Sequence, residues 1–443
     1  MRWPVVWLLQ TCLLLLVLSG SRATADEDTA VSKEDLARRN ILQSNNNTNE
    51  LSISEDSIAY PKVITRMRSI SDRYIIVFSS NSDPGSIKSH FSWLNSQISY
   101  SGHGLRQRVF KKFDGRLIKG YSGTFLRSFV YSIAKRPEID YVESEVIFHA
   151  VDVQQGAPYN LARLSHRETL TNETESTFGY DSDPGAGVTV YILDTGIVVD
   201  HEEFTGRATL VNLVRMSFNT DIVGHGTHVA GTTAGATYGV AKRASIVAVK
   251  VLNDRGSGTT SDIISGLEYV AAQHSENGGP SVINMSLGGS LSSALNEAVR
   301  ATVQQGIHVV VAAGNSGTDA CSSSPASEPS VMTVGASDIN DAIASFSNVG
   351  SCVDVFGPGV NVLSAWNSGN SSTRQLSGTS MASPLVAGLT AYLVAKDPSA
   401  SVADIQQLIK NISTTGMLTN VPSVPPGTPN SIAFNGYTFA SDS

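Results

Sequence analysis

The sequence predicts an α/β protein: a three-layer domain, with a mainly parallel central sheet flanked by helices, preceded by a small α+β domain of ferredoxin-like type. From about residue 186 onwards, short unbroken apolar runs alternate with stretches of helical periodicity. Unbroken Val, Ile and Ala strands between helices are typical of a parallel sheet that is covered on both faces. Between residues 73 and 148 the patterns instead follow the order strand, helix, strand, strand, helix, strand, which is typical of a small α+β domain.

The elements of the small domain are predicted from periodicity and from glycines. Its two helices are recognised by apolar residues at helical spacing. Gly115 and Gly120 interrupt the strand-like stretch in its middle and divide it into separate strands. The predicted helices are 87–98 and 126–136, and the predicted strands lie at 73–78, within 109–125, at 139–143 and at 146–148.

The elements of the larger domain are recognised as short apolar runs for strands and longer periodic stretches for helices. The predicted strands are 188–193, 246–252, 282–285 and 307–312, and the predicted helices are 225–236, 261–274 and 291–305. Strands that are joined by helical crossovers run parallel within one sheet. This alternation therefore accounts for the predicted parallel sheet.

The first 25 residues are typical of a secretory signal. Arg2 supplies a positive charge, and the run 5–18 is apolar apart from Gln10 and Thr11. Ala-Thr-Ala at 23–25 forms a small-x-small cleavage site. The run is short for a bilayer span, which makes an uncleaved membrane anchor the weaker alternative. We expect a secreted protein that is free of the membrane once the signal is removed, with a vacuole or a lysosome-like compartment as the alternative location.

The composition excludes further classes of protein. Apolar residues make up 41% and charged residues 16% of the chain, a balance typical of a globular protein with a sizeable core. The formal net charge of −8 argues against a nucleic-acid partner, which calls for a basic face. No stretch after the signal is as long and apolar as a membrane span.

The cysteines and the sequons fit an oxidising compartment. Cys12 would leave with the signal, so that Cys321 and Cys352 remain. Two such cysteines are expected to pair in an oxidising compartment, whereas in the cytosol they would be two inert thiols. One Asn-x-Ser sequon falls on a predicted buried strand, at Asn284, and is not expected to carry a glycan. The better glycosylation candidates are Asn172, Asn370 and Asn411.

Three polar residues stand at the ends of predicted strands or the starts of helical runs. Asp194 follows the strand 188–193, His225 opens the helix 225–236, and Ser380 opens the apolar run that ends near residue 395. Sites of open parallel sheets gather at the carboxyl ends of the strands. A serine hydroxyl becomes a useful nucleophile when a base takes its proton, and histidine can do so near neutral pH. A carboxylate behind the imidazole fixes its tautomer and stabilises the cation that forms.

The segments around these residues resemble motif blocks of the subtilisin family of serine peptidases, most closely the proteinase K and cerevisin branch. The three blocks are 190–196 (VYILDTG), 224–231 (GHGTHVAG) and 377–384 (SGTSMASP). Similar blocks are found at 156–163 (GAPYNLAR), 324–331 (SPASEPSV) and 345–348 (SFSN). The resemblance covers nearly all of 152–443. It implies a subtilisin-like fold and a serine endopeptidase that forms an acyl-enzyme, with Asp194, His225 and Ser380 as its triad and without an organic cofactor.

The resemblance also implies the remaining parts of an active site. Asn315, in the segment AAGN at 312–315, would supply an oxyanion-hole amide together with the backbone of Ser380. The segment Gly256, Ser257, Gly258 would pair with an extended substrate, and Ser286, Leu287, Gly288 would form the opposite edge and a wall of the primary pocket. Small uncharged residues there favour apolar or aromatic side chains and a broad specificity. Each segment alone could equally be a glycine-rich turn.

A calcium site and a disulfide follow from the same resemblance. One structural calcium ion would be held by the backbone carbonyls of Pro329 and Val331 and by the side chain of Asp354, oxygen ligands that suit calcium. From the sequence alone, Asp354 could also be a solvated loop acid. Cys321 and Cys352 match a bridge position of the aqualysin members of the branch.

The segment of about 73–148 resembles the inhibitor-like propeptide of the family. It implies a zymogen with a signal at 1–25, a propeptide at 26–151 and a peptidase domain at 152–443. The propeptide would chaperone folding, cap the active site and be removed by self-cleavage between about Ala150 and Asp152. The alternative is a separate binding domain that is retained. Protein or peptide substrates and the propeptide itself are the expected partners, and the mature enzyme is expected to be a monomer.

Two alternative functions fit these residues less well, and His228 and Leu385 have structural explanations. An inactive homologue acting as a binding or inhibitory protein would be expected to have lost part of the triad or Asn315. A serine esterase of the α/β-hydrolase type needs Gly-x-Ser-x-Gly and the order Ser, Asp, His, and the chain has neither. His228 lies three residues after His225, but Gly226 stands where a zinc-peptidase motif has a Glu beside its first His, so His228 is expected to be structural. Leu385 stands where the family usually has histidine, which concerns local packing only.

Overall fold

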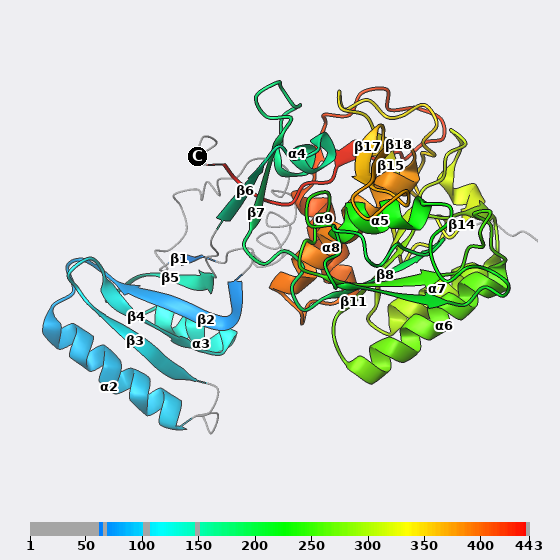
Figure 1. Cartoon of the computed structure of the whole chain (residues 1–443). Helices are drawn as coiled ribbons and strands as arrows, with labels where there is room; N and C mark the ends of the chain where they lie inside the picture. Colours follow the sequence, from blue (N-terminus) through cyan, green and yellow to red (C-terminus); the bar gives the residue numbers. More distant parts are fainter. Residues whose placement is uncertain (1–61, 65–68, 101–106, 147–150, 440–443) are drawn as a thin grey trace, which may run out of the picture.

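The computed structural model describes residues 62–64, 69–100, 107–146 and 151–439. The expected signal at 1–25 and residues 26–61 of the expected propeptide lie outside the described residues. The described chain forms a small domain, up to residue 146, and a large domain, from residue 151 (Figure 1). Each has its own buried hydrophobic clusters, and no cluster contains residues of both domains.

The small domain has a five-stranded sheet in the order β1-β5-β2-β4-β3, and apolar side chains of both its helices join those of the sheet in one cluster. Its elements are β1 (Lys62–Ile64), β2 (Ser69–Phe78), α2 (Pro84–Tyr100), β3 (Arg108–Asp114), β4 (Lys119–Thr124), α3 (Arg127–Ala134) and β5 (Ile139–Val146). The predicted α+β order is confirmed. The two predicted strands at 139–143 and 146–148 are one strand as far as Val146, because Ser144 continues the pairing with Tyr74; residues 147 and 148 lie outside the described residues.

The large domain is built on a nine-stranded sheet in the order β19-β20-β16-β15-β13-β11-β8-β10-β9. Every neighbouring pair is parallel except β19 and β20. The strands are β8 (Thr189–Asp194), β9 (Ala208–Asn212), β10 (Ser245–Lys250), β11 (Ser281–Met285), β13 (His308–Ala312), β15 (Met332–Ser337), β16 (Val355–Pro358), β19 (Thr414–Thr415) and β20 (Ser431–Ile432).

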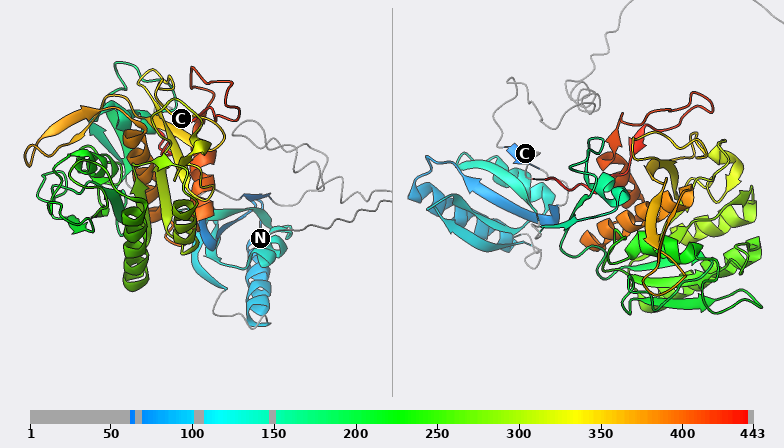
Figure 2. Two further views of the ribbon diagram at one scale, coloured as in Figure 1. Left: turned by 90° about the vertical axis from the view of Figure 1, so that its right-hand side faces the viewer. Right: turned by 45° about the horizontal axis from the view of Figure 1, so that its top comes forward.

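Helices cover both faces of this sheet (Figure 2). Successive side chains of a strand point to opposite faces, and in β8 Val190 and Ile192 join the hydrophobic cluster on one face while Tyr191 and Leu193 join the cluster on the other. The first cluster includes residues of α5 and α8, and the second includes residues of α6 and α7. The helices are α4 (Tyr159–Ser165), α5 (His225–Ala234), α6 (Thr260–Asn277), α7 (Ser293–Gln304), α8 (Thr379–Lys396) and α9 (Val402–Ile412). The predicted three-layer fold is confirmed.

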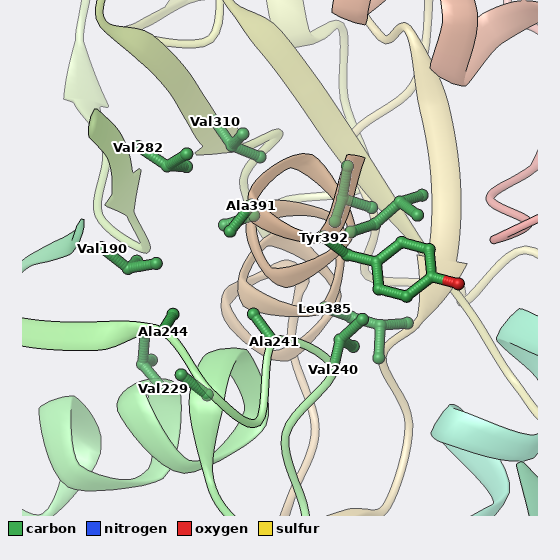
Figure 3. Packing of buried hydrophobic residues seen from close by; sticks show 14 of the residues in the cluster. Val190, Val229, Val240, Ala241, Ala244, Val282, Val310, Leu385, Ala391 and Tyr392 are labelled. Carbon is green, nitrogen blue, oxygen red and sulfur yellow. The ribbon is translucent and has the colours of Figure 1, made fainter. Parts of the chain in front are cut away.

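Helix α8 runs through the larger of these clusters (Figure 3). It is buried over almost its whole length, which explains why its sequence is apolar on every side. Leu385, the residue that replaces the usual histidine of the family, is fully buried in this cluster. The replacement therefore leaves an apolar side chain in an apolar environment.

Short ribbons and one crosslink complete the large domain. The ribbons pair β6 (Val151–Gln155) with β7 (Thr177–Asp181), β12 (Gly289–Ser290) with β14 (Ser323–Ser324), and β17 (Val362–Ala365) with β18 (Thr373–Leu376). Residues 320–322 form a short 3-10 helix. Cys321 and Cys352 form the expected disulfide, with their Cα atoms 5.3 Å apart. Among the described helices, none has the length and apolar content that a membrane span requires.

Candidate active site

Asp194 and His225 are joined directly. Asp194 is the last residue of the buried strand β8, and its side chain is fully buried. His225 is the first residue of α5, and its Nδ1 lies 2.8 and 2.9 Å from the two carboxylate oxygens of Asp194. Because a carboxylate can only accept, Nδ1 carries the proton and Nε2 of the neutral ring is left as the base.

The surroundings of His225 favour its charged form. Burial lowers the pKa of His225, but the charge and the hydrogen bond of Asp194, together with the charge of Asp221, raise this pKa above its ordinary value of 6.5. A partly exposed imidazole with a fixed tautomer and a stabilised cation is suited to accept a proton from a neighbouring hydroxyl.

Ser380 lies in the first turn of α8, and this helix packs against α5, which begins at His225. The Ser380 hydroxyl donates to the carbonyl of Ser286 at 3.4 Å, and the Ser286 hydroxyl donates to the carbonyl of Ser380 at 2.9 Å. Within the described part of the chain, no hydrogen bond joins His225 to Ser380 in this structure. Such contacts are often long without a substrate and tighten when one binds.

Asn315 is oriented by the residue that precedes Ser380. Its Oδ1 accepts from the backbone N–H of Thr379 at 2.8 Å and from the Thr379 hydroxyl at 2.9 Å. With Oδ1 engaged in this way, the amide Nδ2 remains as a donor beside the nucleophile. The turn that carries Asn315 needs Gly314, which has φ of +104° and whose Cβ would lie 2.4 Å from Asn348.

The side chain of Asn348 holds the turn around Asn315 in place through hydrogen bonds, a role that was not predicted from the sequence. Its Nδ2 donates to the carbonyl of Ala313 at 2.9 Å, and its Oδ1 accepts from the backbone N–H groups of Ser316 at 3.0 Å and Thr318 at 3.1 Å. The segment 345–348 resembled the family, but nothing in the sequence says which backbone groups an asparagine side chain will meet.

A cavity of about 290 Å³ opens beside Ser380. Its lining contains both Ser380 and Asn315, and it includes the predicted wall residues Ser286, Leu287 and Gly288. The other lining residues are small and uncharged: Gly289, Ala312, Ala313, Gly314, Ser316, Ser323, Ser324, Ala326, Asn348 and Thr379. The cavity can therefore take an uncharged side chain next to the nucleophile.

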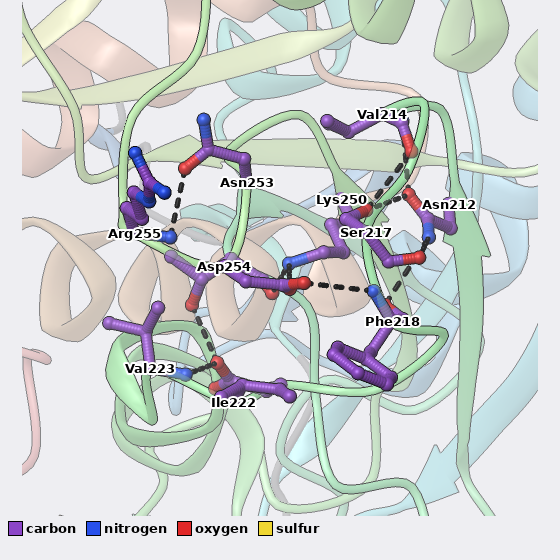
Figure 4. A network of polar contacts seen from close by, with 12 residues as sticks. Asn212, Val214, Ser217, Phe218, Ile222, Val223, Lys250, Asn253, Asp254 and Arg255 are labelled. Carbon is purple, nitrogen blue, oxygen red and sulfur yellow. Dashed lines mark hydrogen bonds and ion pairs between the residues drawn. The ribbon is translucent and has the colours of Figure 1, made fainter.

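The predicted edge segment Gly256, Ser257, Gly258 lies outside that lining, in an exposed turn after β10. The base of the turn is held by Lys250 and Asp254 (Figure 4). The fully buried Lys250 ammonium donates to the carbonyl of Thr195 at 2.6 Å and lies 3.2 Å from the Asp254 carboxylate. This lysine was not predicted from the sequence, because a lysine that ends a strand usually faces solvent.

His228 has a structural environment. It is fully buried, and its Nε2 lies 3.0 Å from the carbonyls of both Val362 and Arg374, in strands β17 and β18. Burial lowers the pKa of His228 to about 4. A neutral imidazole that ties α5 to this ribbon agrees with the structural role expected for it.

The expected calcium ligands do not fit a metal ion in this arrangement. Asp354 lies beside the segment of Pro329 and Val331, as expected, since its Oδ2 accepts from the backbone N–H of Thr333 at 2.7 Å. Its other oxygen, however, lies 2.7 Å from the ammonium group of Lys410. Calcium at Asp354 stays a prediction that this arrangement does not favour, because a positively charged side chain already faces the only acidic ligand of the expected set. Among the described residues, no cluster of three or more His, Cys, Asp or Glu could hold a metal.

Comparisons with known proteins agree with this geometry. Residues 185–430 match the "Subtilase family" and residues 73–150 match "Peptidase inhibitor I9". The "Subtilase-type proteinase psp3" of Schizosaccharomyces pombe is 42% identical over 381 residues, which are 83% of this chain and 83% of that protein. The "Subtilisin-like serine protease Pen ch 18" of Penicillium rubens is 42% identical over 405 residues, 83% of this chain and 81% of that protein.

A solved structure extends the agreement to the fold. The "Crystal structure of a cold adapted subtilisin-like serine proteinase" is 40% identical, with a TM-score of 0.58, and the match covers 63% of this chain and 98% of that one. The buried Asp194 with its His225 partner, the serine at a helix start and the parallel sheet thus occur together with a propeptide domain of the inhibitor type. The chain belongs to the subtilase family and is the zymogen of a subtilisin-like serine endopeptidase.

Proposed function

We propose that peptide bonds are cleaved by the triad of Asp194, His225 and Ser380. The Ser380 hydroxyl attacks the scissile carbonyl while Nε2 of His225 takes its proton, and Asp194 stabilises the imidazolium. His225 then passes this proton to the leaving amine, and a water molecule hydrolyses the acyl-enzyme by the same route in reverse. The observation that carries the proposal is the contact of His225 Nδ1 with both oxygens of the buried Asp194, at 2.8 and 2.9 Å.

The oxyanion of the tetrahedral intermediate is bound by Nδ2 of Asn315 and the backbone N–H of Ser380. Thr379 supports this assignment because it fixes the other end of the Asn315 amide. Donors held in place before the reaction stabilise charge that appears only in the transition state.

The substrate lies extended across the nucleophile, pairing with Gly256–Ser257–Gly258 on one side and Ser286–Leu287–Gly288 on the other. Backbone pairing makes little demand on sequence. The uncharged lining of the cavity beside Ser380 favours an apolar or aromatic residue before the scissile bond. We therefore assign the enzyme a broad specificity.

The zymogen consists of a propeptide at 26–151, with its inhibitor-like domain at about 73–148, and a peptidase domain at 152–443. Ser380 cleaves its own chain near residue 151, and the propeptide acts before that as chaperone and inhibitor. The separate hydrophobic cluster of the small domain supports this division. So does strand β6, which starts at Val151 and pairs along its whole length with β7 of the large domain.

The protein is secreted, with residues 1–25 as its signal, and the mature enzyme is a monomer. The Cys321–Cys352 disulfide is the kind of bond that persists in an oxidising compartment. Asn172, Asn370 and Asn411 are exposed and can accept glycans, whereas Asn284 is buried.

The test compares the wild-type chain with Ser380→Ala by N-terminal sequencing. The wild type is expected to begin near residue 152, and the variant is expected to accumulate as the longer precursor. If both chains mature alike, another protease removes the propeptide. If the mature wild type hydrolyses no peptide, the chain is an inhibitory or binding protein instead.

A further inference from the structure

Helix α9 places two polar side chains on one face, four residues apart. They lie against the two loops that carry the expected calcium ligands of this chain. Nε2 of Gln406 donates to the carbonyl of Ser330 at 2.8 Å, and the ammonium of Lys410 lies 2.7 Å from Oδ1 of Asp354. Residues four apart lie next to each other on a helix. Ile405 and Ile409 are buried in the cluster beneath and fix the helix in this position.

The position of Asp354 is fully determined by these contacts. One carboxylate oxygen accepts from the backbone N–H of Thr333, the other meets Lys410, and the backbone N–H of Asp354 donates to the carbonyl of Thr333 at 2.9 Å. The side chain of Asp354 is 20% exposed and that of Lys410 is 43% exposed. The carboxylate thus has a hydrogen-bond donor and a positive charge without any ion.

A calcium ion at Asp354 would lie beside this ammonium group. Calcium takes 6–8 oxygen ligands at about 2.3–2.6 Å, so an ion on Oδ1 would be within a few ångströms of Lys410. Like charges at such distances repel strongly when they are partly shielded from water. Subtilases commonly bind calcium, but at this position the lysine and the ion exclude each other.

We propose that the ammonium group of Lys410 replaces a structural calcium ion at Asp354. The lysine neutralises the carboxylate and holds α9 against the residue that precedes β16, while Gln406 holds α9 against the segment that precedes β15. A side chain cannot be removed by a chelator, so this part of the fold stays intact at calcium concentrations that would empty a metal site.

The proposal is tested on full-length chains that carry Ser380→Ala, which prevents self-digestion. The melting temperature is measured in chelator and in millimolar calcium chloride, and calcium binding is measured by titration calorimetry. In the parent chain the melting temperature is expected to be the same in both solutions. In Lys410→Met the melting temperature is expected to be lower in chelator and to rise by about 5 °C with calcium. The reason is that an ion bound only to the folded state stabilises it by mass action, and a gain in stability raises the melting temperature.

Three further variants make the result specific. Adding Asp354→Asn to Lys410→Met should abolish the gained calcium response and its heat of binding. Lys410→Arg keeps the charge and should stay indifferent to calcium. Arg300→Met is the control: it breaks an ion pair between Arg300 of α7, which is half-exposed, and the buried Glu328. The guanidinium nitrogen and the carboxylate oxygen of this pair are 2.8 Å apart, and its loss should not create a calcium response that depends on Asp354.

Two results would overturn the proposal. One is a parent chain that binds calcium with a heat that Asp354→Asn removes. The other is a folded Lys410→Met variant whose melting temperature is unchanged by the substitution or is not restored by calcium.

Discussion

The hydroxyl of Thr195 donates to Oδ1 of Asp221 at 2.8 Å, and the same hydroxyl accepts from the backbone N–H of Gly226 at 2.9 Å. Thr195 follows Asp194, and Gly226 follows His225, so the hydrogen bond between Gly226 and Thr195 links the two turns that carry the Asp–His pair. Asp221 is buried and accepts further from the backbone N–H groups of its own loop. These donors are Val223, Gly224 and Thr227, together with the Thr227 hydroxyl.

Asp221 should therefore act as a positioning residue for His225. Its charge helps to raise the pKa of His225. Since His225 acts as a base when it is neutral, kcat/KM rises with pH through this pKa. Asp221→Asn removes the charge, so the acid limb of the kcat/KM profile should shift to lower pH. The variant should also lose about 1–3 kcal/mol of stability, because an amide N–H then faces the donors of Thr227.

Thr195→Val is the control for Asp221→Asn. It removes the hydroxyl that links the two turns but leaves both carboxylates in place. The acid limb should keep its position in this variant even if kcat falls. A profile of Asp221→Asn that coincides with that of the parent would show that Asp221 has a structural role only.

Asn315→Ala should lower kcat by about 10²–10³ while KM changes little, because an oxyanion donor acts mainly in the transition state. The rates are measured with a short peptide substrate. Thr379→Val, which removes one of the two hydrogen bonds to Oδ1 of Asn315, should cause a smaller loss in the same parameter. A rise in KM at constant kcat would mean that Asn315 only binds the substrate.

The triad could be predicted because its signals are local. Asp194, His225 and Ser380 each lie within a short block at a strand end or a helix start, and the sheet brings such ends together. Strand β9 was not predicted, because it is an edge strand with mostly half-exposed residues and no unbroken apolar run. The pairing of Lys410 with Asp354 could not be predicted either, since it depends on which face α9 turns towards a distant loop.

The Cys321–Cys352 disulfide should stabilise the loop beside Asp354. It joins residues 31 apart in the sequence, and closing a loop of that length is worth about 3.7 kcal/mol in the chain-entropy model. In Ser380→Ala chains, replacing both cysteines with serine should lower the urea midpoint of unfolding. Reduction should lower the midpoint of the parent to a similar value and leave the variant unchanged; equal midpoints for all samples would mean that the bond contributes no stability.

The small domain should become less stable as the pH falls below neutrality, because it buries His90. The ring is fully buried, with Nδ1 at 2.7 Å from Oε1 of Glu138 and Nε2 at 2.9 Å from the Tyr121 hydroxyl. Burial lowers the pKa of His90 by more than Glu138 raises it, so the net shift is downward. Burial also raises the pKa of Glu138, but hydrogen bonds, led by that from Arg136, outweigh it and leave this pKa below its ordinary value.

Both shifts have the same consequence. A histidine with a lowered pKa in the folded state takes up its proton first in the unfolded chain, so the stability that is present above about pH 6.5 is lost as the pH falls through that value. Glu138 adds a further loss at lower pH, where the unfolded carboxylate is protonated before the folded one.

Hydrogen exchange of β2 and α2 in the Ser380→Ala chain, corrected for intrinsic rates, should show weaker protection at pH 5.5 than at pH 7.5. In His90→Gln, which keeps a polar side chain without a titrating group, protection should vary less over this range. If the parent and the variant show the same pH dependence, groups other than His90 control the stability of the small domain.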